Sequence, residues 1–385
     1  MRSILLFLCL LPSYLLAQNI VINARVVDTE TNEALPNATI FVNAEKNRIT
    51  NIEGEFILEV SPMDMLTISY VGYKPVKIKA ENVGPVIKLS PYIVELSEVK
   101  VLPLKTILEK VVSTLKNEMA IYKKQESNFY YRQTTQNNGE CCEYIEALIN
   151  GYSEVAVRQP SIITGRYGGL KNTDTKNYSF VGNYYDMSCI SPYTSHKLSK
   201  KKLIIPLMAD SKIKYNMDYE ILCDKANENY IYRIVFTPYS NVKVPIVKGV
   251  IYVDADSYKI LKYEGDFLNY NIISKKGERF PLKHTFSVIY TYYHGFMEVQ
   301  SVTTKGTYSQ HGISVSINTT LANVGQKYYK GKKKLGDTSN LIQKINSTGY
   351  DAKFWNDNTI IKRTSIEEKV MRMFEKDNVF NNMTE

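Results

Sequence analysis

The chain has 385 residues, of which 44% are hydrophobic and 23% are charged, so it is long enough to bury two substantial cores. Lys and Arg outnumber Asp and Glu by 48 to 39, a formal net charge of +9 that favours contact with anionic surfaces. Beyond the N-terminus no stretch approaches 18 consecutive apolar residues, which excludes a membrane-spanning helix from the mature chain.

Residues 1–17 have the charge, length and small-residue end of a secretory signal peptide. Arg2 is their only charged residue, and an apolar run leads to Ala17, so we expect cleavage between Ala17 and Gln18. A membrane anchor is the alternative, but an anchor needs about 20 apolar residues and would have to tolerate Pro12.

Residues 18–90 predict a small β-sandwich. Short runs of β-branched and aromatic residues are bounded by Pro, Asn and Gly, as in residues 39–42, 56–60 and 66–70. Pro36 cannot donate a backbone hydrogen bond and precedes Asn37, which is typical of a turn between strands.

Four fragments of this stretch occur in a characteristic order: Val26-Val27-Asp28, residues 33–40, Gly54-Glu55-Phe56 and residues 66–73. This order resembles the carboxypeptidase regulatory-like domain. The resemblance implies an immunoglobulin-like or transthyretin-like β-sandwich and a place in the Gram-negative envelope, in the periplasm or at the outer membrane. The same module precedes TonB-dependent outer-membrane transporters. The resemblance implies no reaction, and Ala24 stands where the family commonly has Gly.

Residues 91–120 predict an extended connector followed by a helix that begins after Pro103. Apolar residues recur at helical spacing, while lysines and glutamates fill the other side. We expect this amphipathic helix to pack on a sheet.

Residues 121–385 predict a larger antiparallel β domain with a few packed helices. From residue 128 to about residue 322 the hydrophobic period is two, and short turns join successive strands. The predicted strands are Phe129–Thr135, Tyr144–Val157, Tyr230–Thr237, Lys248–Asp254, Tyr258–Phe267, Lys283–Tyr293, Phe296–Thr304 and Ile313–Leu321. Gly, Asn, Lys and Asp interrupt the pattern in residues 160–228, which we interpret as long loops with minor helix.

The end of the chain predicts a capped helix. Thr364 and Glu367 have the spacing of a capping box, and the apolar residues that follow recur at helical spacing. Trp355 is the only tryptophan of the chain, so we expect this tail to dock on the domain body.

No motif in the sequence points to catalysis, a metal or a cofactor. None of the four histidines has the spacing of a zinc peptidase, and His294 and His311 each precede Gly at an expected hairpin turn. No serine-hydrolase elbow, Walker loop or dinucleotide fingerprint occurs. Cys141, Cys142, Cys189 and Cys223 remain after signal removal, and the sequence leaves open whether they form disulfides.

Two groups of residues are candidates for ligand or surface contact. Tyr290, Tyr292 and Tyr293 fit a half-buried sheet and can also offer flat faces and hydroxyl groups to glycans or lipids. Lys330, Lys332 and Lys333 belong to a basic cluster that can meet anionic lipid or lie solvated in a loop.

These features predict a non-enzymatic cell-envelope protein that binds or docks, with an envelope protein, a glycan or a lipid as its partner and no nucleic acid. One alternative comes from residues 248–260, which resemble hairpins of the half-barrel carriers of periplasmic lipids and lipoproteins and imply a curved sheet around an apolar groove. A hydrolase with an unrecognised site is the third hypothesis.

Overall fold

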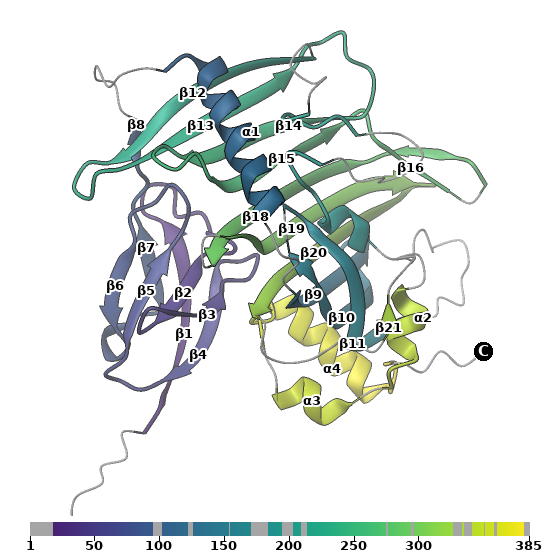
Figure 1. Cartoon of the computed structure of the whole chain (residues 1–385). Helices are drawn as coiled ribbons and strands as arrows, with labels where there is room; N and C mark the ends of the chain where they lie inside the picture. The colour runs from purple at the N-terminus through teal and green to yellow at the C-terminus, as the bar shows by residue number, and fades with distance from the viewer. Residues whose placement is uncertain are drawn as a thin grey trace, which may run out of the picture. The chain divides into compact units, whose positions relative to one another are not determined.

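The computed structural model describes residues 18–94, 102–121, 126–153, 155–170, 184–194, 203–208, 214–274, 276–293, 296–325, 333–334, 341–349, 351–357 and 360–380 (Figure 1). The fold is mainly β, as the sequence predicts. The chain divides into two compact units, Met1–Ser90 and Pro91–Glu385.

The N-terminal unit contains two small sheets around its own core. Their strand orders are β4-β1-β7, with bounds Glu55–Val60, Ile20–Asp28 and Val86–Leu89, and β3-β2-β5-β6, with bounds Glu45–Ile49, Thr39–Val42, Met65–Ser69 and Val76–Lys79. β1 is antiparallel to β4 but parallel to β7. Val26, Ile40 and Leu66 are fully buried between the sheets, which confirms the predicted sandwich.

Gly54 explains one turn of this unit. Its φ is +75°, which favours glycine, and a Cβ at this position would lie 2.5 Å from the carbonyl oxygen of Val26. The Tyr73 hydroxyl donates to Asp28 at 2.7 Å and ties the end of β1 to the segment after β5.

The second unit is built on one sheet of twelve strands, whose order is β21-β11-β10-β9-β20-β19-β18-β15-β14-β13-β12-β8. Neighbouring strands are antiparallel throughout. The bounds are β8 Ile93–Val94, β9 Glu126–Asn137, β10 Glu140–Ser153, β11 Val157–Gly169, β12 Tyr215–Asp224, β13 Asn229–Pro238, β14 Ile246–Asp254, β15 Ile260–Leu268, β18 Lys283–Tyr293, β19 Phe296–Gln310, β20 Ile313–Gly325 and β21 Lys333–Lys334. A hairpin of β16 (Asn271–Ile273) and β17 (Arg279–Pro281) forms a separate two-stranded sheet.

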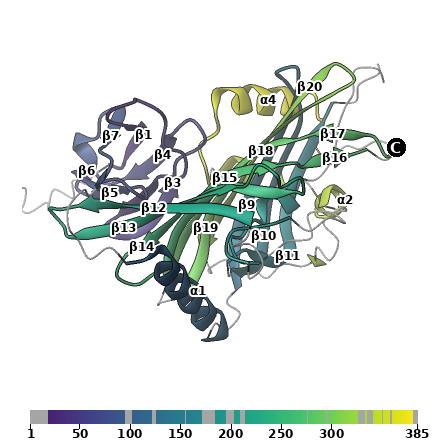
Figure 2. The same ribbon diagram turned by 90° about the horizontal axis from the view of Figure 1, so that it is seen from above.

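Helices cover both faces of the large sheet, as Figure 2 shows for α1 and α4. α1 (Leu104–Ile121) and α2 (Leu341–Asn346) pack into the main apolar core on one face, which we call the α1 face. α4 (Ser365–Lys376) packs on the opposite face, the α4 face, and α3 (Ala352–Asp357) precedes it along the chain. The capping box at Thr364 and Glu367 is present, as predicted.

Two parts of the strand prediction were wrong. Residues 160–228 contain β12 and most of β11, and the strand predicted over Tyr144–Val157 spans the end of β10 and the start of β11. β11 was missed because its glycines were interpreted as loop residues, whereas they allow close packing against helices. A Cβ at Gly165 would lie 2.9 Å from Ile345, and one at Gly168 would lie 2.3 Å from Phe374. The predicted turn at His311-Gly312 is confirmed by positive φ at both residues, whereas His294-Gly295 lies outside the described residues.

Candidate functional site

The α1 face is a continuous apolar surface across ten strands. Directly paired residues form one row from β12 to β11, and all but Tyr219 and Gly165 belong to the buried core: Tyr219, Ile234, Ile251, Tyr263, Val288, Val302, Leu321, Tyr131, Ala147 and Gly165. α1 covers this face with Ile107, Leu108, Val111 and Leu115. The predicted amphipathic helix therefore packs on the sheet as expected.

A second row on the same face is polar at its centre. Thr304 of β19 pairs with Thr319 of β20, and Thr319 pairs with Gln133 of β9. These side chains are buried, and the Thr304 and Thr319 hydroxyls are 2.7 Å apart. His284 of β18 and Gly306 of β19 are paired in the adjoining row. We call these five residues the socket.

Residues 184–190, which we call the seated segment, lie on the socket. The segment includes a short 3-10 helix, η4 (Tyr185–Ser188), that contacts β19 and β20. The backbone N–H of Tyr184 donates to Gln133 at 3.0 Å, and the Tyr184 hydroxyl lies 2.8 Å from His284 Nδ1. The Ser188 hydroxyl is 2.9 Å from that of Thr319. Hydrogen bonds thus fix both ends of η4 on the sheet.

Gly306 makes room for Tyr184. A Cβ at Gly306 would lie 2.2 Å from the Tyr184 hydroxyl oxygen, far closer than van der Waals contact allows. The glycine therefore determines how deeply the tyrosine enters the sheet. Tyr185, Cys189 and Ile190 are also buried and join the main core.

His284 is neutral in this environment. Burial lowers its pKa to about 3, because an imidazolium ion would lose its hydration there. Within the described residues neither its Nε2 nor the hydroxyl of fully buried Tyr263 has a hydrogen-bond partner. Phe267 and Phe286 contact these side chains, with ring centroids 4.3 Å from His284 and 4.8 Å from Tyr263 respectively. An unpaired buried polar atom is costly, so this part of the apolar face can accept a polar group of a ligand or water.

Polar contacts hold α1 at one border of this face. Lys110 Nζ donates to the Tyr258 hydroxyl at 3.0 Å, and Lys259 Nζ lies 3.5 Å from a Glu118 carboxylate oxygen. Burial raises the pKa of Glu118, and nearby Lys259 opposes that rise. The apolar residues of α1 in the main core contribute more to its attachment than these two polar contacts do.

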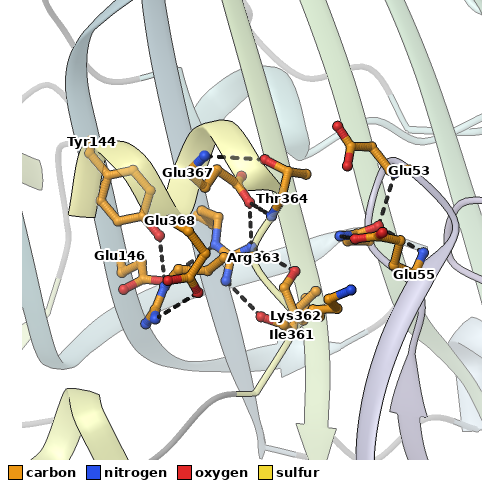
Figure 3. Close-up of polar contacts among 12 residues, drawn as sticks. Glu53, Glu55, Tyr144, Glu146, Ile361, Lys362, Arg363, Thr364, Glu367 and Glu368 are labelled. Atoms are coloured by element: carbon orange, nitrogen blue, oxygen red, sulfur yellow. Dashed lines mark hydrogen bonds and ion pairs between the residues drawn. The ribbon is translucent and has the colours of Figure 1, made fainter. Parts of the chain in front are cut away.

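The α4 face carries a different feature, a buried charged cluster around Glu146. Arg132 of β9, Glu146 of β10 and Arg166 of β11 are directly paired across the strands. Arg363, which precedes α4, lies 3.5 Å from Glu146, and the Tyr144 hydroxyl donates to Glu146 at 2.7 Å (Figure 3). Burial would raise the pKa of Glu146, but Arg166, Arg363 and Arg132 together hold it well below the ordinary value.

This cluster fastens the end of the chain to the sheet. Arg132 donates to the carbonyl oxygens of Ile361 and Lys362 and lies 3.0 Å from Glu367. The Arg166 guanidinium carbon lies 5.1 Å from the ring centroid of Trp355 and 5.1 Å from that of Phe380. Because these partners belong to the C-terminal segment of the chain, the cluster attaches that segment to the sheet.

The sequence-predicted contact residues lie in different environments. Tyr290 is buried, and its hydroxyl donates to the Val155 carbonyl oxygen at 3.0 Å. Tyr292 is half-buried on the α1 face, where its hydroxyl donates to the Ile260 carbonyl oxygen at 2.9 Å. Tyr293 ends β18, with its side chain outside the described residues. Ligand contact at these tyrosines stays a prediction.

The predicted lysines and cleavage site are only partly described. Lys333 begins β21, whereas Lys330 and Lys332 lie outside the described residues. Ala17 also lies outside them, and Gln18 is exposed. Both expectations stay predictions.

Cysteines and metal ligands form no further site in the described part of the chain. Cys141 and Cys142 are free thiols, and burial raises the pKa of each to about 12, while Cys189 and Cys223 are buried. Among the residues that the structure describes, no group of His, Cys, Asp or Glu could hold a metal ion. No described helix is both long and apolar enough to cross a membrane.

Sequence reasoning missed the socket and the seated segment. Tyr184 lies in a region interpreted as loop, and Gln133, Thr304 and Thr319 are separated widely along the chain. The alternation of the strands was a signal that these polar residues share the apolar face, but only the register brings them together.

These features define a two-unit, mainly β protein with a large antiparallel sheet. Residues 22–101 match the family model of the CarboxypepD_reg-like domain, so the chain contains a domain of this family, as its sequence motifs predict. No curated protein has a matching sequence.

Solved structures similar to this chain share little sequence identity with it. A LolA superfamily protein from Nitrosomonas europaea is 10% identical, with 58% of this chain and 94% of that chain covered and a TM-score of 0.22. A DUF1329 family protein from Desulfovibrio piger is 12% identical, with the same coverage and a TM-score of 0.20. A membrane-associated protein of unknown function from Bacteroides fragilis is 8% identical, with 80% and 98% covered and a TM-score of 0.16.

Proposed function

We propose that this chain is a non-enzymatic binding protein of the Gram-negative cell envelope, and that the α1 face of its large sheet holds an apolar ligand. The CarboxypepD_reg-like domain serves as an interaction module. A signal peptide ending at Ala17 exports the chain to the periplasm or the outer membrane.

Two buried polar atoms within the aromatic face carry this proposal: the Tyr263 hydroxyl and His284 Nε2, neither of which has a hydrogen-bond partner in the part of the chain that the structure describes. Ligand sites are mostly apolar surfaces with a few polar groups that fix the ligand's orientation. Tyr263 and His284 supply such polar groups beside the apolar rings of Phe267 and Phe286. The His284 imidazole is neutral, so it can donate or accept a hydrogen bond without carrying charge. An acyl chain with an oxygen-containing head group has the matching chemistry.

Binding can be tested on the full chain exported by a Gram-negative host. Native mass spectrometry of the purified protein, followed by organic extraction, should reveal a bound amphiphile, and titration with the apolar fluorophore N-phenyl-1-naphthylamine should saturate. The double variant Tyr263→Phe with His284→Phe keeps the face apolar and removes both polar groups, so it should change which molecules co-purify. Absence of both a co-purified amphiphile and saturable fluorophore binding would refute the proposal.

Export can be tested separately. N-terminal sequencing of the mature protein should begin at Gln18, and cell fractionation should place it outside the cytoplasm. An intact Met1 in cytoplasmic material would overturn the assignment to the envelope.

A further inference from the structure

We propose that the seated segment, residues 184–190, occupies the ligand position on the α1 face and must leave the socket before a ligand binds. This inference rests on the proposed function. The seated segment competes with the ligand for this position, and the ligand meets the hydrogen-bonding groups of the socket.

Uncharged groups attach the seated segment to the socket. Its polar contacts to the socket use one backbone N–H and two hydroxyl groups, from Tyr184 and Ser188. None of these contacts is an ion pair. A hydroxyl or amide group of a ligand can replace each of them, so exchange of segment for ligand conserves the hydrogen bonds of the sheet.

Hydrogen bonds within the sheet keep the socket organised without the segment. The Gln133 side chain also accepts a hydrogen bond from the Tyr131 hydroxyl at 2.8 Å, and the Thr319 hydroxyl stays hydrogen-bonded to that of Thr304. Departure of the segment therefore leaves Gln133, Thr319 and His284 as a preformed set of hydrogen-bonding groups beside an aromatic surface.

Tyr184 indicates the chemistry of the ligand. Its ring lies in the apolar face, its hydroxyl meets His284, and its N–H meets Gln133. The socket therefore fits an amphiphile whose aromatic or aliphatic body carries a hydroxyl or amide group. The socket side chains that bond the segment, Gln133, His284 and Thr319, are uncharged, so a ligand needs no anionic head group to replace these bonds.

Gly306 provides a variant that unseats the segment. In Gly306→Ala the new methyl group would collide with the Tyr184 hydroxyl, so the bound form of the segment is destabilised. Gly168→Ala is the matched control, because its methyl group would collide with Phe374 on the α4 face. Both variants overpack a strand glycine by one methyl group, but only the first acts on the socket.

A disulfide provides the opposite change. The Ser188 and Thr319 hydroxyl oxygens are 2.9 Å apart, so cysteines at these positions are close enough to bond and hold the segment in place. The pair Ser188→Cys and Thr319→Cys is made in a Cys189→Ala background, so that the neighbouring thiol does not compete. Thr319→Cys alone in that background is the control for oxidation.

The readout is the Kd for N-phenyl-1-naphthylamine, with circular dichroism as a check of folding. We expect Gly306→Ala to bind the fluorophore about tenfold more tightly than the native chain does, because displacing the segment raises the fraction of molecules that can bind it. Gly168→Ala should bind the fluorophore as the native chain does. The oxidised disulfide variant should lose binding, and dithiothreitol should restore it. If Gly306→Ala fails to fold, Tyr184→Phe, which removes only the hydroxyl, should still tighten binding about threefold.

Two results would overturn the inference in different ways. Equal binding by the oxidised and reduced disulfide variants would show that the segment need not leave, while the binding function itself would stand. No binding by any variant, including the native chain and Gly306→Ala, would refute the proposed function together with the inference.

Discussion

Glu146 and Arg166 face each other on paired strands, and neither side chain has any exposed surface. The guanidinium donates from both Nε and Nη2 to one carboxylate oxygen, the first at 2.7 Å. Removing one partner of such a pair leaves a buried charge without compensation, whereas the intact pair contributes little net stability.

Glu146→Gln should therefore strongly destabilise the second unit. The change leaves the charges of Arg132, Arg166 and Arg363 without their shared carboxylate, and we expect a loss of about 3–5 kcal/mol in the free energy of unfolding. Urea unfolding followed by fluorescence measures it, since Trp355 is the only tryptophan and is buried beside Arg166.

Glu375→Gln is the control for that measurement. Glu375 also pairs with Arg166, at 3.4 Å, but its side chain is 38% exposed, so solvent screens the interaction and the loss should stay below about 1 kcal/mol. Equal losses in the two variants would contradict a central role for Glu146.

Gly249→Ala should disrupt the pairing of β14 with β15. A Cβ at Gly249 would lie 2.0 Å from the Glu264 carbonyl oxygen, a backbone atom that cannot rotate away. We expect a loss of about 1–3 kcal/mol and faster amide hydrogen exchange in both strands. Gly84→Ala is the comparison, because nothing lies within 4 Å of its Cβ position, and it should leave stability unchanged. Unaltered exchange in β14 of Gly249→Ala would mean that the strands are not this close.

Thr364→Ala should loosen the start of α4. Thr364 accepts from the Glu367 N–H at 3.3 Å, and Glu367 accepts from the Thr364 N–H at 2.8 Å. Loss of the side-chain cap should cost about 1 kcal/mol and accelerate limited proteolysis after residue 360. Ser365→Ala, a change at an exposed neighbouring position, should leave the cleavage rate as it is. A cleavage rate that rises equally in both variants would argue against the capping role.

Stability should decrease as the pH falls below 6.5 because of His284. Its folded pKa of about 3 is below its ordinary value of 6.5, so in this range the unfolded chain takes up a proton that the folded chain does not. The contribution is complete above pH 6.5 and should fall by about 1.4 kcal/mol for each pH unit well below that value, until the folded pKa is reached.

Urea midpoints from pH 7 to pH 5 test this dependence. This range lies above the ordinary pKa of carboxylates, which limits their contribution. His284→Gln cannot take up the proton and should show a shallower pH dependence than the native chain. Parallel curves for the two proteins would assign the dependence to other groups.

The sequence predicted regular strands well because alternation reports directly which side chains enter the core. β13, β14, β18 and β20 follow this rule, and Thr364 with Glu367 located the last helix. β11 was missed because Gly165 and Gly168, which make space for Ile345 and Phe374, look like turn residues in isolation. The socket was missed for a different reason: strand register joins its residues, and no local pattern records that register.

The parallel pairing of β1 with β7 has a mechanical consequence. Arg25 to Asp28 lie beside Val86 to Leu89 in the same direction, so the chain enters the N-terminal unit at one end and leaves it at the other. At about 3.3 Å per residue, Ile20 is about 26 Å from the level of Asp28 and Leu89. A tether attached ahead of β1 would thus pull along the strands and load their ladder in shear, a geometry that resists force better than peeling strands apart one bond at a time.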